Sequence, residues 1–180
     1  MNRTSKITAA MLAACGLSLT GAATAGASPT HASARLNKSD TAFLKSNEQV
    51  NLAEITLGKI VLRRSDGPRA RELARVTIRD HRKAEQEVKS VARKDGVVLP
   101  SAPNAAQQKV AAALRAVPSH VALTYFKDQV AGHKTSIAAT KSELKNGSRR
   151  NVLRYARAYL PVAQMHLRMS ETDLHRLQNR

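Results

Sequence analysis

The fold is decided by one stretch of the chain, PSHVALTYFKDQVAGHKTSIAATKSELKNG, which spans residues 118–147. Its apolar side chains recur at helical spacing along one side: Leu123, Phe126, Val130, Ile137 and Leu144. Pro118 and Ser119 favour a helix start, and Asn146-Gly147 favours a helix end. An amphipathic helix of this length must bury its apolar side against other elements, so the stretch predicts a helical bundle.

The same signals predict three more long helices and one short helix. We expect these helices at about residues 39–64, 68–94, 105–116 and 148–177. Helix starts are favoured at Ser39-Asp40, Pro68 and Asn104, and no strand pattern of useful length competes. Two short turns and one longer crossover then join four long helices. The sequence therefore predicts an all-α four-helix bundle with one short extra helix in the crossover.

The first 27 residues predict an export signal peptide. A short basic start precedes an uncharged run rich in Ala and Leu, and we expect cleavage after Ala25-Gly26-Ala27. The alternative is a lipoprotein anchored at Cys15, because Leu12-Ala13-Ala14-Cys15 resembles the lipobox of bacterial lipoproteins. Both alternatives place the protein outside the cytoplasm, either extracellular or associated with the cell envelope.

The remaining sequence predicts one domain. Residues 28–38 are small, polar and proline-containing, which is typical of a flexible lead-in, and we assign residues 39–180 to the bundle. The hydrophobic fraction of 42% is too high for a disordered chain. A single Cys excludes a disulfide scaffold.

The charge predicts polyanionic partners. The chain has 30 Lys+Arg against 13 Asp+Glu, a formal net charge of +17. For an exported protein, we expect anionic envelope polymers or lipid headgroups to be its partners. No recognition motif points to specific nucleic-acid binding, and the sequence does not indicate an oligomeric state.

One ionisable side chain falls within the apolar arc of each long helix, at about 100° per residue. These four are Glu54, His81, His133 and His166. Counted from the predicted turns, the first three share one level of the bundle to within roughly 5 Å. Burying such groups costs several kcal/mol unless they are paired or ligated. We therefore expect them to lie near one another.

Two interpretations of this interior layer remain open. One carboxylate and two or three imidazoles can hold iron, zinc or copper, as in a metal-binding or redox-stress protein. Alternatively, the layer is a hydrogen-bonded polar layer of a non-catalytic protein without a cofactor, which is the outcome we expect. No Glu-x-x-His occurs in the sequence, which excludes a di-iron centre of the ferroxidase type.

A second group of metal-ligating side chains lies near the end of the last helix. Its members are Met165, His166, Met169 and His175, and thioether and imidazole ligands suit Cu(I). Methionines on one helix also pack against neighbouring helices. The alternative interpretation is therefore ordinary packing.

Several motifs resemble one family of exported bacterial proteins of unknown function. They are Asn51-Leu-Ala-Glu54, Asp80-His81-Arg-Lys-Ala84, Val98-Leu99-Pro100, Gly132-His133-Lys134 and Leu160-Pro161 with His166-Leu167. The resemblance covers about residues 39–174. It implies a ferritin-like four-helix fold, export and Asp-His pairs on helices, but no activity. The family tends to have Asp before the histidine at position 133, where this chain has Gly132.

Overall fold

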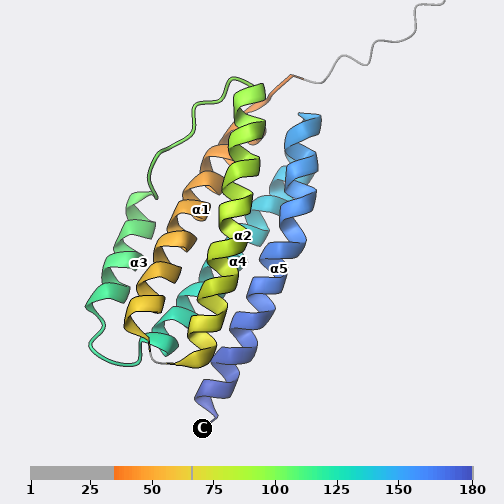
Figure 1. Cartoon of the computed structure of the whole chain (residues 1–180). Helices are drawn as coiled ribbons and strands as arrows, with labels where there is room; N and C mark the ends of the chain where they lie inside the picture. The colour runs from red at the N-terminus through yellow and green to blue at the C-terminus, as the bar shows by residue number, and fades with distance from the viewer. Residues whose placement is uncertain (1–34, 66, 180) are drawn as a thin grey trace, which may run out of the picture. The chain divides into compact units, whose positions relative to one another are not determined.

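The structure is a computed structural model that describes residues 35–65 and 67–179. Over these residues it is all-helical (Figure 1). Its helices are α1 (Lys38–Arg64), α2 (Pro68–Lys94), α3 (Ala105–Ala116), α4 (Val121–Asn146) and α5 (Arg150–Gln178). The predicted signal peptide and Cys15 lie outside the described residues, as does most of the lead-in.

The four long helices pack as two antiparallel hairpins, α1 with α2 and α4 with α5. The hairpins meet along α1 with α4 and along α2 with α5. The crossover returns the chain to the end at which α2 begins, because a Cβ at Gly67 would lie 3.4 Å from Ala122. The predicted four-helix bundle with one short extra helix in the crossover is confirmed.

The short helix α3 packs outside the bundle, on α1 and α4. Its start is capped as predicted, because the Asn104 side chain accepts a hydrogen bond from the Gln107 backbone. At its end, the guanidinium of Arg64 donates to the carbonyl oxygens of Leu114 and Val117, at 2.9 and 2.7 Å. These bonds satisfy carbonyl groups that a helix end leaves without partners.

The start of α1 differs from the expectation. Asn37, and not Ser39-Asp40, is the capping residue, and Asp40 is the third helical residue of a reciprocal capping box. The Asp40 carboxylate also accepts hydrogen bonds from the backbone nitrogens of Ser148 and Arg149, both at 3.1 Å. One side chain thus helps to cap the start of α1 and also binds the start of α5.

The interior consists of two apolar clusters with a polar layer between them. One cluster surrounds Phe43, Leu44, Val88 and Tyr155, and the other surrounds Ile60, Leu73, Leu114 and Tyr125. On each long helix, buried polar side chains lie between the two clusters. They include Asn51, Glu54, Thr77, His81, Gln129, His133 and His166.

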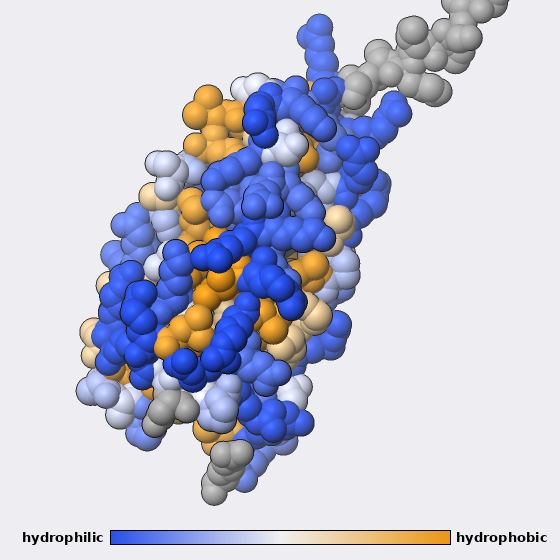
Figure 2. Space-filling model, in the orientation of Figure 1, coloured by the Kyte–Doolittle hydropathy of each residue, from blue (hydrophilic) through white to orange (hydrophobic). Residues whose placement is uncertain are grey.

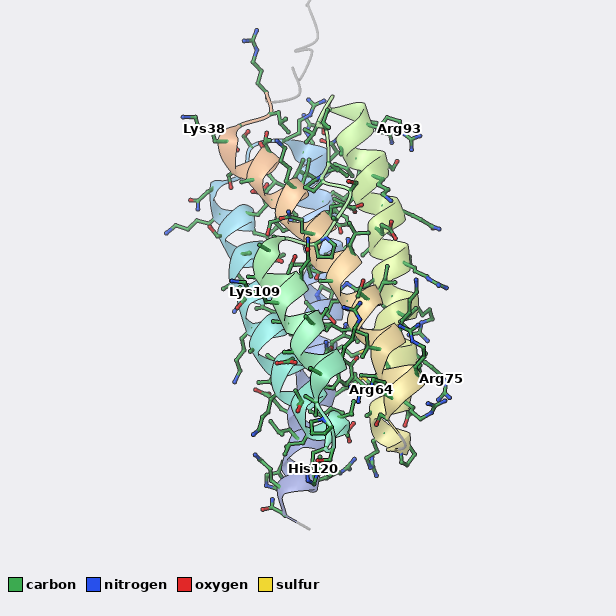
Figure 3. The ribbon with its side chains drawn as sticks, turned by 90° about the vertical axis from the view of Figure 1, so that its left-hand side faces the viewer. Lys38, Arg64, Arg75, Arg93, Lys109 and His120 are labelled. Atoms are coloured by element: carbon green, nitrogen blue, oxygen red, sulfur yellow. The ribbon has the colours of Figure 1, made fainter. Side chains whose placement is uncertain are left out.

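The outer faces are hydrophilic. Figure 2 shows hydrophilic residues over most of one face, with apolar atoms between them. In Figure 3, Lys38, Arg75 and Arg93 point away from the helices. None of the described helices is both long and apolar enough to cross a membrane.

Candidate metal centre

Three of the four predicted interior side chains meet in the polar layer. His81 comes from α2, His133 from α4 and His166 from α5, and one ring nitrogen of each lies within 4.8 Å of the others. The ring centroids are 5.2 to 5.9 Å apart. None of the three residues is more than 1% exposed. We call these residues the histidine triad.

One nitrogen of each ring faces a hydrogen-bond acceptor at the edge of the triad. His81 Nδ1 lies 2.9 Å from Asn51 Oδ1, and His133 Nδ1 lies 2.9 Å from the Gln129 carbonyl oxygen. His166 Nε2 lies 3.0 Å from Asp80 Oδ2. Because carbonyl and carboxylate oxygens only accept, each of these ring nitrogens carries the proton.

In neutral rings, the other nitrogen of each histidine therefore carries a lone pair. His133 Nε2 and His166 Nδ1 face each other at 3.2 Å, so two lone pairs meet there. His81 Nε2 is buried and has no hydrogen-bond partner in the described structure. Three acceptor nitrogens that lie this close together form a set of ligand atoms that could hold a proton or a metal ion.

Burial opposes a proton at this position. It lowers the pKa of His81 well below its ordinary value, and the charges of His166 and His133 lower it further. Burial and the charge of His133 also lower the pKa of His166, to about 4, although Asp80 opposes this shift. The lone pairs of these two rings are therefore free at neutral pH.

Two of the acceptors are themselves held in place. Asn51 donates through Nδ2 to Asn47 Oδ1, at 3.2 Å, and the Tyr155 hydroxyl also donates to that oxygen. This fixes the Asn51 amide with its oxygen toward His81. Arg79 donates to Asp80 at 2.7 Å. Although burial raises the pKa of the Asp80 carboxyl, hydrogen bonds from Arg79 and His166 hold it below its usual value.

Glu54 is the predicted residue that the structure does not bring into the triad. Its Oε2 accepts a hydrogen bond from Gln129 Nε2 at 2.5 Å, and its carboxylate faces a cavity between α1 and α4. Gln129 therefore separates Glu54 from His133, because its backbone oxygen binds the histidine and its side chain binds the glutamate.

The second predicted group of ligands does not assemble. His166 faces the triad, whereas the exposed His175 pairs with the Asn179 amide. Met169 packs against the apolar cluster that contains Leu73. Packing accounts for this methionine.

Sequence reasoning missed Asn51 and Gln129 as partners of the triad, because both bind histidines through contacts that periodicity does not reveal. Asp80 is also a partner of the triad, because its carboxylate accepts hydrogen bonds from Arg79 and from His166 on α5. The sequence feature that could have identified Asp80 as a histidine partner is its position directly before His81. Adjacent helical residues point about 100° apart, so Asp80 serves a different histidine from the one beside it.

Two solved structures resemble this chain in fold. A DUF305 fragment from Deinococcus radiodurans matches with a TM-score of 0.70 and 18% identity, over 79% of this chain and 99% of that chain. CopM in its Cu(I)-bound form matches with a TM-score of 0.65 and 14% identity, over 77% and 96%. At these identities, the likeness shows the fold. No curated protein matches the chain.

A protein-family model described as "Domain of unknown function (DUF4142)" matches residues 25–172. The match covers all of α1 to α4 and most of α5, including the histidine triad. The predicted resemblance to a family of unknown function is thereby confirmed.

Proposed function

We propose that this chain, which belongs to the DUF4142 family, binds one transition-metal ion through His81, His133 and His166. The observation that carries the proposal is the set of three buried ring nitrogens within 4.8 Å of one another, each in a ring whose other nitrogen faces a hydrogen-bond acceptor. Imidazole is a ligand for zinc, copper, iron and nickel. Metal-binding histidines usually donate their other ring N–H to a carbonyl or carboxylate oxygen, and here Asn51, the Gln129 carbonyl and Asp80 are those acceptors.

The spacing of the ligands fits an ion. At metal–nitrogen distances of about 2.0–2.1 Å, two nitrogens of a tetrahedral site lie about 3.3 Å apart. His133 Nε2 and His166 Nδ1 are 3.2 Å apart. His81 reaches the same position with a modest movement, since the three nitrogens lie within 4.8 Å of one another.

Cu(I) is the ion that the charges favour. The ligands are neutral, and the carboxylate beside them, Asp80, is already paired with Arg79, so little negative charge offsets a bound ion. The cost of burying an ion rises with the square of its charge, so a monovalent ion costs about a quarter as much as a divalent one. The fold likeness to CopM, which is solved in a Cu(I)-bound form, agrees with this choice.

Binding is the function that the burial of the triad supports. Because the triad is at most 1% exposed, a substrate cannot reach an ion held there without movement of the helices. A bound ion would accept the lone pairs of the three rings, and its ligands would link α2, α4 and α5 to one another. We therefore propose metal binding or storage.

Metal titration tests the proposal. We expect the full chain to bind one equivalent of Cu(I) in competition with a chromogenic Cu(I) chelator, under reducing conditions. An ion that binds only the folded protein must also raise the melting temperature by mass action. We expect His81→Ala and His133→Ala to abolish both effects.

Matched controls use histidines and a carboxylate outside the triad. His120 and His175 are exposed, and Glu54 lies apart from the triad. His120→Ala, His175→Ala and Glu54→Gln should bind Cu(I) as the wild type does. A chain that binds no metal, or whose binding survives both triad substitutions, would contradict the proposal and favour a metal-free polar layer.

A further inference from the structure

A cavity of about 390 Å³ lies between α1, α4 and α3, apart from the histidine triad. Its volume is typical of small-molecule sites. None of the triad histidines lines it. Much of its wall is apolar, through Phe43, Val50, Leu57 and Val110. Such a wall is suited to an organic ligand.

The ionisable side chains of this cavity are both acidic. Glu54 and Asp128 line it, and no Lys, Arg or His does. In a chain with 30 Lys+Arg against 13 Asp+Glu, an acidic cavity is opposite in sign to the protein as a whole. A cation is therefore attracted to this cavity although the surface repels it.

Glu54 is unusually placed for a carboxylate. It is only 6% exposed, and no Lys, Arg or His of the described residues forms an ion pair with it. Its Oε2 accepts from Gln129, whereas its Oε1 has no hydrogen-bond donor in the described part of the chain. Glu54 therefore offers the cavity an acceptor oxygen with no protein donor, and a cation in the cavity would be its partner.

Gly132 keeps the free oxygen of Glu54 accessible. A Cβ at Gly132 would lie 3.6 Å from Glu54 Oε1, and Gly132 lines the cavity. A larger side chain at this position would extend over the carboxylate. Gly132 thus leaves one side of the acidic group open.

We propose that the cavity binds a small organic cation, a protonated alkylamine, with its ammonium group at Glu54 and its alkyl body against the apolar wall. An ammonium group offers three donors and a positive charge. Glu54 Oε1 and the Asp128 carboxylate supply the acceptors. The apolar wall selects an alkylammonium over a hydrated inorganic cation, because a hydrated ion leaves that wall in contact with water.

Isothermal titration of the full chain with n-hexylammonium tests the proposal, with 1-hexanol and hexanoate as probes of equal chain length. We expect hexylammonium to bind at least tenfold more tightly than hexanol, and hexanoate not to bind. Glu54→Gln keeps an acceptor for Gln129 but removes the charge, and it should weaken hexylammonium binding at least tenfold. Glu72→Gln, which removes an exposed acidic group on α2, should have no effect.

A second variant separates recognition from folding. Gly132→Val places a branched side chain beside Glu54 on an exposed part of α4, and should weaken hexylammonium binding while the protein stays folded. Ala138→Val, also exposed on α4 but outside the cavity wall, is its control. Equal affinity for hexylammonium and hexanol, no binding at millimolar concentrations, or equal competition by Ca²⁺ would overturn the proposal. Binding should survive His81→Ala, which keeps it distinct from the metal centre.

Discussion

At the scale of single residues, Asn51 illustrates how the histidine triad depends on its hydrogen-bond partners. Its amide oxygen accepts from His81 Nδ1 at 2.9 Å, and this bond keeps the lone pair on His81 Nε2. Asn47 and Tyr155 in turn fix the orientation of the amide. Asn51, which would not itself touch a bound ion, therefore sets which nitrogen of His81 can bind it.

The first prediction at this scale concerns Asn51→Leu. We expect Cu(I) affinity to fall about 10–100-fold, which is typical for loss of an outer partner of a metal-binding histidine. Asn51→Asp keeps an acceptor and should retain most of the affinity. Chelator competition measures both variants. Unchanged affinity in Asn51→Leu would show that the His81 tautomer is not fixed by this bond.

A second prediction at this scale concerns Glu143, which is 1% exposed and accepts a hydrogen bond from Ser39 at 2.6 Å. Burial raises the pKa of its carboxyl to about 7, and nearby Asp40 adds to the shift. In the unfolded chain the group ionises near pH 4.5. The folded state therefore holds a proton that the unfolded state has lost, and stability falls as the pH rises from about 4.5 to 7.

We expect Glu143→Gln to remove this loss, because its amide stays neutral. Chemical denaturation gives the free energy of unfolding at pH 4 and at pH 8. Relative to the wild type, that of the variant should rise by about 1–3 kcal/mol from pH 4 to pH 8. Glu72→Gln, at an exposed position, should follow the wild type at both. Parallel pH profiles for Glu143→Gln and the wild type would contradict this account.

At the scale of helices, the approach of α1 to α2 depends on Gly58. A Cβ there would lie 2.6 Å from Ile78 Cγ1 and 3.1 Å from the Ala74 carbonyl oxygen. These distances are shorter than van der Waals contact, so the two helices could not keep their spacing. The glycine therefore allows the hairpin to close.

We expect Gly58→Ala to destabilise the bundle by about 1–3 kcal/mol through overpacking. Helix propensity alone would stabilise it by about 1 kcal/mol, so the sign of the change separates the two effects. Gly132→Ala on α4 is the matched control, because its nearest contact would be an ordinary 3.6 Å. It should be stabilising in the same denaturation experiment. Stabilisation by both changes would show that α1 and α2 adjust freely.

At the scale of the whole molecule, the positive charge is the dominant surface property. Binding to anionic envelope polymers stays a prediction, as do export and the lipid-anchor alternative at Cys15. We expect affinity for polyphosphate to fall steeply with salt, because several Lys and Arg contacts release counterions together. Reversal of the exposed Arg75, Arg82 and Arg93 to Glu should weaken it without unfolding the bundle.

Arg79 is left out of that set because it holds Asp80 beside His166. A titration of the triple variant and the wild type between low and high salt measures the effect. DNA duplexes of different sequence should bind the wild type equally. Salt-independent binding, or a clear sequence preference, would contradict an electrostatic origin.

The sequence by itself determined the helices and which side of each faces inward. Helical periodicity depends on residues close together in the chain, so Phe126 and Ile137 were enough to indicate the inner side of α4, whereas Leu123 is only partly buried. It also placed His81, His133 and His166 in the interior, because position within an apolar arc is a local property. The Asn104 cap and the turn after Arg64 were local for the same reason.

Only the tertiary structure decided what those interior groups bind. Rotation and sliding of one helix against another are set by side-chain packing over the whole interface, to which residues far apart in the chain contribute. That packing put Asp80 beside His166 on another helix and Asn51 beside His81, and it placed Gln129 between Glu54 and His133. The position of a residue in its helix fixes the direction of its side chain. The group that this side chain contacts belongs to a different helix.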